Sequence, residues 1–413
     1  MALIGLFIYR VIGALIILPL AFFLRKHSNF HGTVAKRLGF DLPQVPAGRD
    51  TIWIHAASVG EVKAVSNLLK VIKSCKPDLF IAMSSMTVTG RKVAAELPEV
   101  DCVFPLPFDL PCVMKRHLLR IMPKALFIVE TEIWPNMVLA AEKLAIPVVF
   151  MNARMSVHSY KWYRRLAPVF KRILSHAKVF AMAEGDATHF RSIGARDVQV
   201  IGNLKLDQVA TGDKTKAEAL RQELGVGDRP VFIAGSVREG EEMEVVDAII
   251  QIAMKIPNNY SIIAPRHLNK VDYIKDIAQR LNIKWALRSK PVPTADLLIV
   301  DTMGELFTLY GMSDAAFVGG SLINLGGQNI LEPIAWGVPT LHGPYMSNFA
   351  WAQEAVNGHT IMVKNSRELS HAVCGLLLDR DASRARGLKA REALLSSSGV
   401  TQRYISSIEP FLL

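Results

Sequence analysis

The sequence predicts an α/β protein with two Rossmann-like, doubly wound domains, preceded by an N-terminal helix that anchors it to a membrane. Its 413 residues exceed what a single hydrophobic core usually organises, so two domains are expected. Apolar residues make up 50% of the chain and charged residues 21%, a balance that excludes disorder. Short β-branched segments alternate with segments of helical length, as in parallel sheets covered by helices on both faces.

The first element is an apolar stretch over residues 2–24, interrupted only by Arg10. Its unbroken part, 11–24, is shorter than the roughly 20 residues needed to cross a bilayer. A span therefore has to begin at Ala2, with Arg10 reaching towards the headgroups. We interpret residues 1–26 as an uncleaved anchor, with a helix that dips into the membrane without crossing it as the alternative. Basic residues follow at Arg25, Lys26, Lys36 and Arg37. They predict that the body of the protein lies on the cytoplasmic side of the membrane.

The positive charge of the chain is concentrated in its first half. Residues 1–200 carry 26 Lys and Arg against 14 Asp and Glu, whereas residues 201–413 carry 22 against 23. Such asymmetry predicts an anionic partner, although any single basic residue is more often part of a solvated helix face. Nucleic acid is not expected, because no basic motif is interleaved with aromatic residues. Phospholipid and a phosphorylated substrate remain as candidate partners.

The four cysteines show neither CxxC nor metal-ligand spacing. They are Cys75, Cys102, Cys112 and Cys374. We interpret them as reduced residues of the core, and we predict no disulfide framework and no metal site.

The predicted strands form two groups of five. The first group comprises residues 51–55, 79–83, 125–129, 148–152 and 179–183. The second comprises residues 231–235, 260–264, 296–300, 315–319 and 338–341. The polar segment 209–216 lies between them, so we predict a first domain over 27–208, a linker over 209–216 and a second domain over 217–413. Ligands of such sheets bind at the carboxyl ends of the strands, which directs attention to the residues that follow each strand.

Three segments of the first half place charged residues after predicted strands. Glu61 follows the small residues of 55–60 and is expected in the first turn of a helix; it either serves chemistry or only complements the helix dipole. Glu130 and Glu132 end the strand at 125–129. They either divide acid–base and positioning roles or pair with a cation to fix a loop. Lys205 lies close to the linker and could meet a phosphate, although an exposed lysine is more often structural.

In the second half, Arg266 follows a predicted strand and offers a guanidinium for a phosphate or a base edge. Residues 301–306 also follow a strand. The segment 234–241 has backbone N–H groups that could bind an anion, but it lacks the motifs for NAD or ATP. The glycine-rich loop 319–333 is expected to run into a helix whose first turn carries Asn329 and Glu332. There, Glu332 could accept the ribose hydroxyls of a nucleotide while the loop amides face its phosphate.

Together these motifs resemble the family of Kdo transferases, which move 3-deoxy-D-manno-octulosonic acid (Kdo) from CMP-Kdo to a lipid A precursor. The resemblance covers nearly the whole chain. It rests on the motifs at 55–61, 130–135, 202–207, 234–242, 265–267, 301–306, 326–333 and 343–344. Two departures are Gln328, where this family commonly has His, and 237–239, where it commonly has Thr-His-Pro. Gln328 makes a proton-transfer role at that position doubtful.

The resemblance implies a GT-B fold, an inverting transfer, no cofactor and no essential metal. It makes Glu61 the general base that deprotonates the acceptor hydroxyl, and it places Glu130 and Lys205 where the transition state is stabilised. It assigns the binding of CMP to three segments of the second half. Their residues are Pro265, Arg266, Met303, Gly304, Glu305, Asn329, Ile330, Leu331 and Glu332. The expected partners are thus the CMP-Kdo donor and a lipid A precursor (lipid IVA) as acceptor, in lipopolysaccharide core synthesis. The resemblance also implies contact with phospholipid of the bacterial inner membrane, with the catalytic domains on its cytoplasmic side.

Two other functions are compatible with the residues. The nearest is another GT-B transferase that uses a UDP-sugar on a lipid acceptor. From a different class, a non-catalytic lipid-binding protein would account for the basic half, but it would leave the clustered carboxylates without a use.

Overall fold

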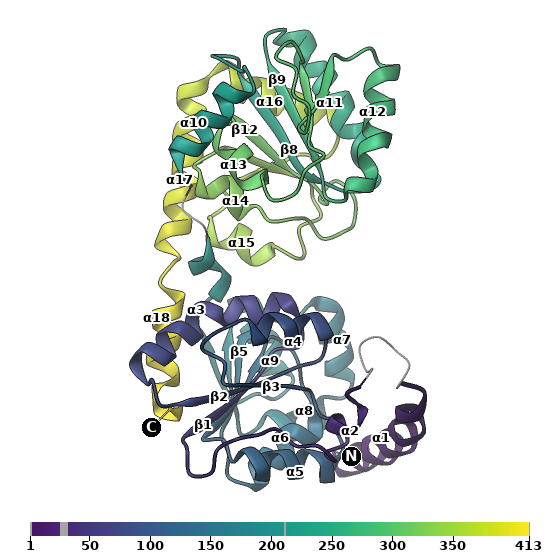
Figure 1. Ribbon diagram of the computed structural model, residues 1–413, viewed down its shortest axis with the longest axis vertical. Coiled ribbons are helices and arrows are strands. Elements are labelled where there is room, and N and C mark those ends of the chain that lie inside the picture. Colours follow the sequence, from purple (N-terminus) through teal and green to yellow (C-terminus); the bar gives the residue numbers. More distant parts are fainter. Residues whose placement is uncertain (1, 25–31, 210–211, 413) are drawn as a thin grey trace. The chain divides into compact units, whose positions relative to one another are not determined.

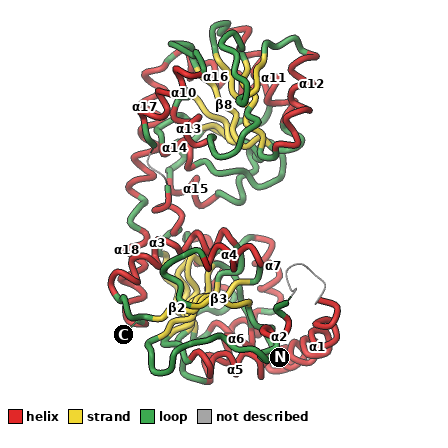
Figure 2. The backbone as a smooth tube through the Cα atoms, viewed as in Figure 1, coloured by secondary structure: helices red, strands yellow, loops and turns green. Residues whose placement is uncertain are grey.

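The computed structural model describes residues 2–24, 32–209 and 212–412, and the described chain divides into two compact units. The first comprises Met1–Gln208 with Gly399–Leu413, and the second comprises Val209–Ser398. Each unit contains one sheet with helices packed on its faces (Figure 1; Figure 2).

The first unit is built on a seven-stranded sheet in the order β3-β2-β1-β4-β5-β6-β7, with every strand pair parallel. Its strands are β1 (Thr51–His55), β2 (Phe80–Ser85), β3 (Cys102–Pro105), β4 (Ala125–Val129), β5 (Val148–Ala153), β6 (Ala177–Ala181) and β7 (Asp197–Val200). Its helices are α1 (Ala2–Leu24), α2 (Val34–Arg37), α3 (Val59–Cys75), α4 (Val88–Ala95), α5 (Pro111–Ile121), α6 (Pro135–Lys143), α7 (Val157–Arg165), α8 (Ala167–Leu174), α9 (Glu184–Ser192) and α18 (Val400–Ile408), with the short turns η1 (Leu204–Gln208) and η3 (Glu409–Phe411). The strand order reverses between β1 and β4, where a doubly wound sheet binds its ligand.

The second unit repeats this plan with the strand order β10-β11-β9-β8-β12-β13-β14, again all parallel. Its strands are β8 (Val231–Val237), β9 (Tyr260–Pro265), β10 (Trp285–Leu287), β11 (Leu297–Ile299), β12 (Ala315–Val318), β13 (Thr340–His342) and β14 (Ile361–Met362). Its helices are α10 (Lys214–Glu223), α11 (Glu242–Lys255), α12 (Val271–Arg280), α13 (Leu306–Gly311), α14 (Leu331–Ala335), α15 (Ala350–Ala355), α16 (Ser366–Leu378) and α17 (Arg380–Ser396), with the turn η2 (Leu268–Lys270). The reversal falls between β8 and β12.

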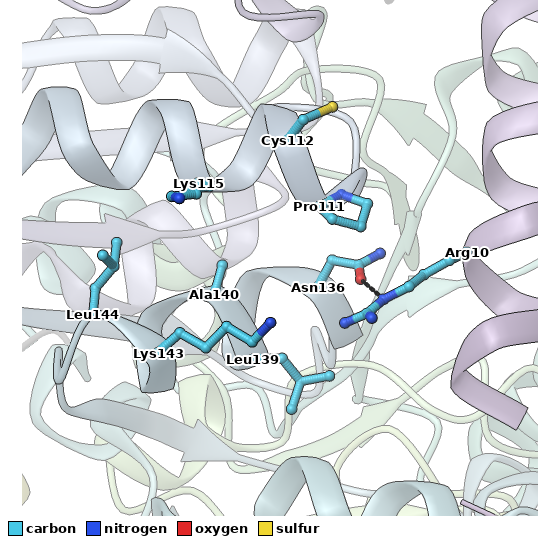
Figure 3. A pocket seen from close by; sticks show the side chains of 9 residues that line it. All are labelled: Arg10, Pro111, Cys112, Lys115, Asn136, Leu139, Ala140, Lys143 and Leu144. Carbon is cyan, nitrogen blue, oxygen red and sulfur yellow. Dashed lines mark hydrogen bonds between the residues drawn. The ribbon is translucent and has the colours of Figure 1, made fainter. Parts of the chain in front are cut away.

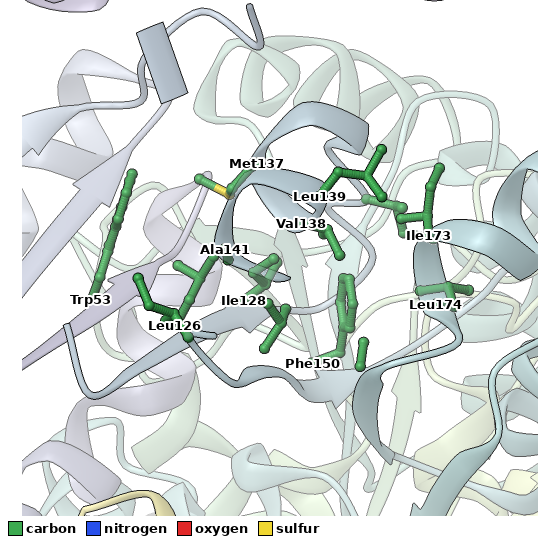
Figure 4. Packing of buried hydrophobic residues seen from close by; sticks show 14 of the residues in the cluster. Trp53, Leu126, Ile128, Met137, Val138, Leu139, Ala141, Phe150, Ile173 and Leu174 are labelled. Carbon is green, nitrogen blue, oxygen red and sulfur yellow. The ribbon is translucent and has the colours of Figure 1, made fainter. Parts of the chain in front are cut away.

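The core of the first unit explains why the central strands are largely apolar. Trp53 of β1, Ile128 of β4 and Phe150 of β5 are fully buried, and Met137 of α6 and Leu174 of α8 pack in the same cluster (Figure 4). Because helices cover both faces of a parallel sheet, a central strand has no polar side, and its sequence shows no alternation. Burying each such side chain contributes roughly 1.5–3 kcal/mol.

The predicted strands are all present, and their bounds differ from the observed ones by two residues at most. Four further strands were not predicted: β3, β7, β10 and β14. All four are edge strands of the two sheets. The prediction of two parallel α/β sheets is confirmed.

The unit boundaries differ from the predicted ones at both ends of the second half. Helix α10 begins at Lys214 and is capped by Asp213, so the predicted linker 209–216 extends too far. Residues 399–413 belong to the first unit, not to the second as predicted. They are held there by the carboxylate of Asp207, which accepts hydrogen bonds from the backbone N–H groups of Gly399 and Thr401, and by the fully buried Tyr404.

Helix α1 covers most of the predicted anchor. Among the described residues, no helix has the length and apolar character of a membrane span. One side of α1 packs on the first unit, where Leu6 is buried. Large apolar side chains of the other side, among them Leu3, Phe7 and Leu15, are 68–79% exposed. Arg25 and Lys26, which entered the prediction of topology, lie outside the described residues.

The interpretation of all four cysteines as core residues is wrong. Cys374 is buried, but Cys75 and Cys112 are exposed on α3 and α5, and Cys102 is intermediate. A small residue on an amphipathic helix can lie on either face, and no sequence spacing distinguished them.

Candidate active site

The first group of candidate residues meets at the carboxyl ends of β1, β4 and β5. In the register of the sheet, His55 at the end of β1 lies beside Ile128 of β4. The segments that leave these two strands therefore start side by side. Glu61, Glu130 and Glu132 line one hollow together with Arg154, as the rule for doubly wound sheets predicts.

Glu61 lies in the first turn of α3 and is buried, with 9% of its surface exposed. One carboxylate oxygen accepts a hydrogen bond from the backbone N–H of Ala57 at 2.6 Å, and the other accepts one from the Ser58 hydroxyl at 3.0 Å. Burial, followed by the negative charge of Glu130, raises the pKa of Glu61 to about 7, although the two hydrogen bonds oppose the shift. If Glu61 only complemented the helix dipole, its carboxyl group would not need to be buried away from solvent. A pKa near 7 is what a general base requires at neutral pH.

Glu130 directly follows β4 with a backbone φ of 60°. This left-handed conformation is uncommon for a residue with a Cβ and is typical of strained functional loops. Its carboxylate accepts a hydrogen bond from the Lys205 Nζ at 3.3 Å, and both side chains are partly buried. The pairing of Glu130 with a cation, which the sequence left as one of two alternatives, is present, and the cation is Lys205. The structure therefore brings two predicted site residues together.

Lys205 owes its place to two buried asparagines. The Asn203 Oδ1 accepts a hydrogen bond from the backbone N–H of Lys205, and the Asn152 Oδ1 accepts one from Leu204, at 2.9 and 3.0 Å. The backbone N–H of Asn152 in turn donates to the Tyr404 hydroxyl at 2.8 Å. The C-terminal helix therefore supports the turn that carries Lys205.

Glu132 differs from its neighbours because it faces the His55 ring. The His55 Nε2 lies 3.9 Å from a Glu132 oxygen, an electrostatic contact, and the Trp134 Nε1 donates to the same oxygen at 2.9 Å. Burial favours a raised pKa, but the nearby imidazole and the indole N–H lower the pKa of Glu132 overall. The hollow therefore holds two carboxyl groups whose pKa values move in opposite directions, an arrangement typical of acid–base sites.

In the second unit, Glu332 lies in the first turn of α14 beside Asn329, whose Nδ2 donates to it at 3.1 Å. Burial raises the pKa of Glu332, whereas the Asn329 amide and the positive charge of Arg266 lower it in part. Three polar residues predicted to bind CMP are thus close enough to interact: Arg266 after β9, Asn329 before α14 and Glu332 within α14. Asn329 precedes the helix instead of lying within its first turn, and its Oδ1 accepts the N–H of Leu331.

The other residues predicted to bind CMP differ in how far they are exposed. Ile330, Leu331 and Pro265 are buried, while Met303 and Gly304 are exposed. Glu305 caps α13 and binds the Arg288 guanidinium at 2.8 Å and the Thr302 hydroxyl. The described contacts do not join Glu305 to Glu332.

The glycine-rich loop after β12 corrects one expectation. The amides of Gly320, Ser321 and Leu322, expected to face a phosphate, donate to the carboxylate of Glu241. Glu241 is fully buried and also accepts the N–H of Arg238, so this N–H group of segment 234–241 is occupied as well. An internal carboxylate, and not a ligand, binds these amides.

Arg154 and Glu241 are among the residues of these sites that were not predicted from the sequence. Arg154 follows β5 and lines the hollow around Glu61, so applying the strand-end rule to this strand would have found it. Glu241 had no such signal, because the loop that it binds is 79 to 81 residues away in the chain. No group of His, Cys, Asp and Glu suited to a metal occurs in the described parts of the chain. The predicted independence of metal stays a prediction.

Two units, each with a parallel seven-stranded sheet and candidate residues at its carboxyl edge, form a GT-B type fold. The crystal structure of a glycosyltransferase from Rickettsia africae ESF-5 shares this fold, with a TM-score of 0.63 and 15% identity over 88% of this chain and 98% of that one.

The sequence comparisons narrow the class to one family. Residues 32–208 match the family described as 3-Deoxy-D-manno-octulosonic-acid transferase (kdotransferase). The 3-deoxy-D-manno-octulosonic acid transferase of Haemophilus influenzae is 31% identical over 94% of this chain and 93% of that protein. The transferase of the same name from Bordetella pertussis is 29% identical over 87% of each. This chain belongs to the Kdo transferase family, as its motifs indicated.

Proposed function

We propose that this protein transfers Kdo from CMP-Kdo to a sugar hydroxyl of a lipid A precursor, with inversion at the anomeric carbon and with Glu61 as general base. Membership of the Kdo transferase family supports the reaction. The observation that carries the role of Glu61 is its desolvated carboxyl group with a pKa of about 7, in a hollow lined by acidic and basic side chains.

The reaction needs a base because a sugar hydroxyl is a weak nucleophile. In our proposal the ionised Glu61 accepts the proton of the acceptor hydroxyl as its oxygen attacks the anomeric carbon of Kdo. The bond from that carbon to CMP breaks, and CMP leaves with the bonding pair. A base with a pKa near the working pH is ionised in half of the molecules and still binds the proton well, which contributes about 10²–10⁴-fold to the rate.

Glu130 and Lys205 are proposed to stabilise the charges that develop in this step. The sugar ring becomes positive and departing CMP becomes more negative, so an anionic group near the first and a cation near the second lower the barrier. Their mutual contact at 3.3 Å keeps both ionised groups in defined positions before the substrates arrive. The strained backbone of Glu130 is consistent with a residue whose placement serves chemistry.

The donor is proposed to bind to the second unit through Arg266, Asn329 and Glu332. Glu332 would accept the ribose hydroxyls, and Asn329 orients its carboxylate through a hydrogen bond of 3.1 Å. Arg266 is exposed at the end of β9 and contributes a positive charge beside Glu332. Pro265, Met303, Gly304, Glu305, Ile330 and Leu331 complete the proposed CMP-binding segments.

We further propose that the protein works at the bacterial inner membrane, on its cytoplasmic side, in contact with phospholipid. The exposed apolar side of α1 and the net positive charge of residues 1–200 support this proposal. A lipid acceptor is consistent with such a location.

Mass spectrometry of the products tests the proposal. Incubation with CMP-Kdo and lipid IVA should give a lipid heavier by whole Kdo residues, together with free CMP. The Glu61→Gln variant serves as the control and should give almost none. If a UDP-sugar is transferred and CMP-Kdo is not, the proposed donor is wrong.

A further inference from the structure

A second cavity of the first unit lies between α5 and α6, with α1 at one end. It encloses about 320 Å³, and none of its nine lining residues is shared with the hollow around Glu61. Figure 3 shows the side chains of α5 and α6 facing each other across it, and Arg10 entering from α1. Neither the proposed chemistry nor the proposed binding of CMP uses this cavity.

The charged residues of the cavity all have the same sign. Arg10, Lys115 and Lys143 line it, and no acidic residue does. Lys115 and Lys143 are exposed on α5 and α6, and the Lys143 side chain extends along α6 towards Arg10 in Figure 3. Three cations without a carboxylate among them form a site for an anion.

The position of Arg10 is fixed by a buried network. Its Nε donates to the Oδ1 of Asn136 at 2.8 Å, and Asn136 is 2% exposed. Asp109, also buried, accepts hydrogen bonds from the backbone N–H of Asn136 and from the Tyr9 hydroxyl, both at 2.9 Å. Burial raises the pKa of Asp109, although the bonds from Asn136 and Tyr9 oppose this shift. This network therefore holds the Arg10 guanidinium at the cavity. Its members are Tyr9 of α1, Asp109, and Asn136 at the start of α6.

Apart from Asn136 and Cys112, the rest of the lining is apolar and suits a hydrocarbon chain. Leu139 and Ala140 of α6, and Leu144 just after it, lie opposite Pro111 of α5. Inorganic phosphate would use the cations and leave this surface uncovered. A phospholipid would use both, since its headgroup carries a negative phosphodiester and its acyl chain begins a few atoms away.

We infer that this cavity binds an anionic phospholipid, with its phosphodiester among Arg10, Lys115 and Lys143 and the start of an acyl chain on the apolar wall of α6. The inference rests on the proposed location at a membrane. It makes that proposal more specific, because it assigns the attraction to charged lipid to one defined site. Arg10 then serves as a phosphate ligand within the apolar N-terminal helix.

The protein carries a natural reporter of this site. Cys112 is exposed and lines the cavity, whereas Cys75 is exposed on α3 and does not. We would measure the rate of maleimide alkylation of both thiols in the full chain by peptide mass spectrometry. The probe is dihexanoyl phosphatidylglycerol below its critical micelle concentration, compared with dihexanoyl phosphatidylcholine and with inorganic phosphate.

Occupied protein should be alkylated slowly at Cys112 and normally at Cys75. At ten times the dissociation constant of phosphatidylglycerol, alkylation of Cys112 should be about tenfold slower. Equal protection by phosphatidylcholine or by inorganic phosphate would overturn the inference, as would equal protection of Cys75 or no protection at all.

A pair of substitutions tests the cations without disturbing the fold. Lys115→Ala with Lys143→Ala should raise the phosphatidylglycerol concentration needed for protection by about tenfold or more, because two charge-assisted contacts are lost. Lys70→Ala with Lys92→Ala removes the same charge from exposed positions on α3 and α4 and should change nothing. An equal effect of both pairs would contradict a defined site. Kdo transfer, measured separately in detergent without phospholipid, shows whether the proposed function itself has failed.

Discussion

Replacing Glu61 by Gln should stabilise the protein while it removes activity. In the folded protein the pKa of Glu61 is about 7, compared with 4.5 for an unperturbed glutamate. Between these values the unfolded chain has released the proton and the folded chain still holds it. The unfolded state therefore binds fewer protons, and stability falls as the pH rises through this interval. The destabilisation reaches its full size above the folded pKa.

The structure supplies the size of the effect. A difference of about 2.5 pKa units at roughly 1.4 kcal/mol per unit is about 3 kcal/mol of stability, lost by the wild type above pH 7. Glutamine carries no charge. Its side-chain oxygen can still accept the hydrogen bond from the Ala57 N–H, which is 2.6 Å long in the wild type, and its NH₂ group can face the Ser58 hydroxyl. It should escape most of this penalty.

Denaturant unfolding of the full chain near pH 4 and near pH 8 measures the effect. The Glu61→Gln variant should match the wild type at about pH 4 and exceed it by roughly 3 kcal/mol at about pH 8. Glu368→Gln is the matched control, since Glu368 also lies in a first helical turn and accepts a backbone N–H, at 3.0 Å, but is exposed. A gain of equal size at both pH values, or a loss at pH 8, would refute the argument that Glu61 is held desolvated for function.

Three further substitutions test the division of roles. Lys205→Ala should lower kcat by roughly 10²-fold or more and leave CMP affinity in calorimetry unchanged, because its proposed role is confined to the transition state; a loss confined to affinity would contradict this. Glu332→Ala should weaken CMP binding by about 1–3 kcal/mol, the range for a charged hydrogen-bonding partner, and unchanged affinity would remove Glu332 from the CMP site. Glu241→Gln places an amide N–H₂ against backbone donors of the glycine-rich loop, so it should lower the Tm and raise KM for the donor; a normal KM would show that the loop does not serve donor binding.

The central strands and the charged strand ends could be predicted from the sequence because both follow from the parallel sheet. The middle of a strand buried on both faces must be apolar, and residues 52–54 of the first strand and Ala125–Val129 are. The edge strands were not predicted because each has a neighbouring strand on one side only, so its other side can face solvent. Three of the four residues of Asp197–Val200 are exposed, and their sequence, Asp-Val-Gln-Val, resembles a loop.

Other features depend on contacts between distant parts of the chain. Glu241 meets the loop at Gly320, and Tyr404 meets Asn152, from positions with no recognisable spacing. The pKa of Glu61 likewise depends on burial and on Glu130, which lies on another strand end. The sequence could indicate which residues were candidates, but only the packed structure distinguishes a desolvated carboxyl group from an exposed one.

The pH dependence of kcat/KM for Kdo transfer tests the central claim, that Glu61 is the base, most directly. This quantity reports the ionisation of the free enzyme, so the wild type should gain activity with rising pH and level off above a pKa of about 7. The small residual activity of Glu61→Gln should not show this rise with pH. A wild-type profile that is flat across neutral pH, or a variant that keeps both this rise and near-normal turnover, would contradict the account.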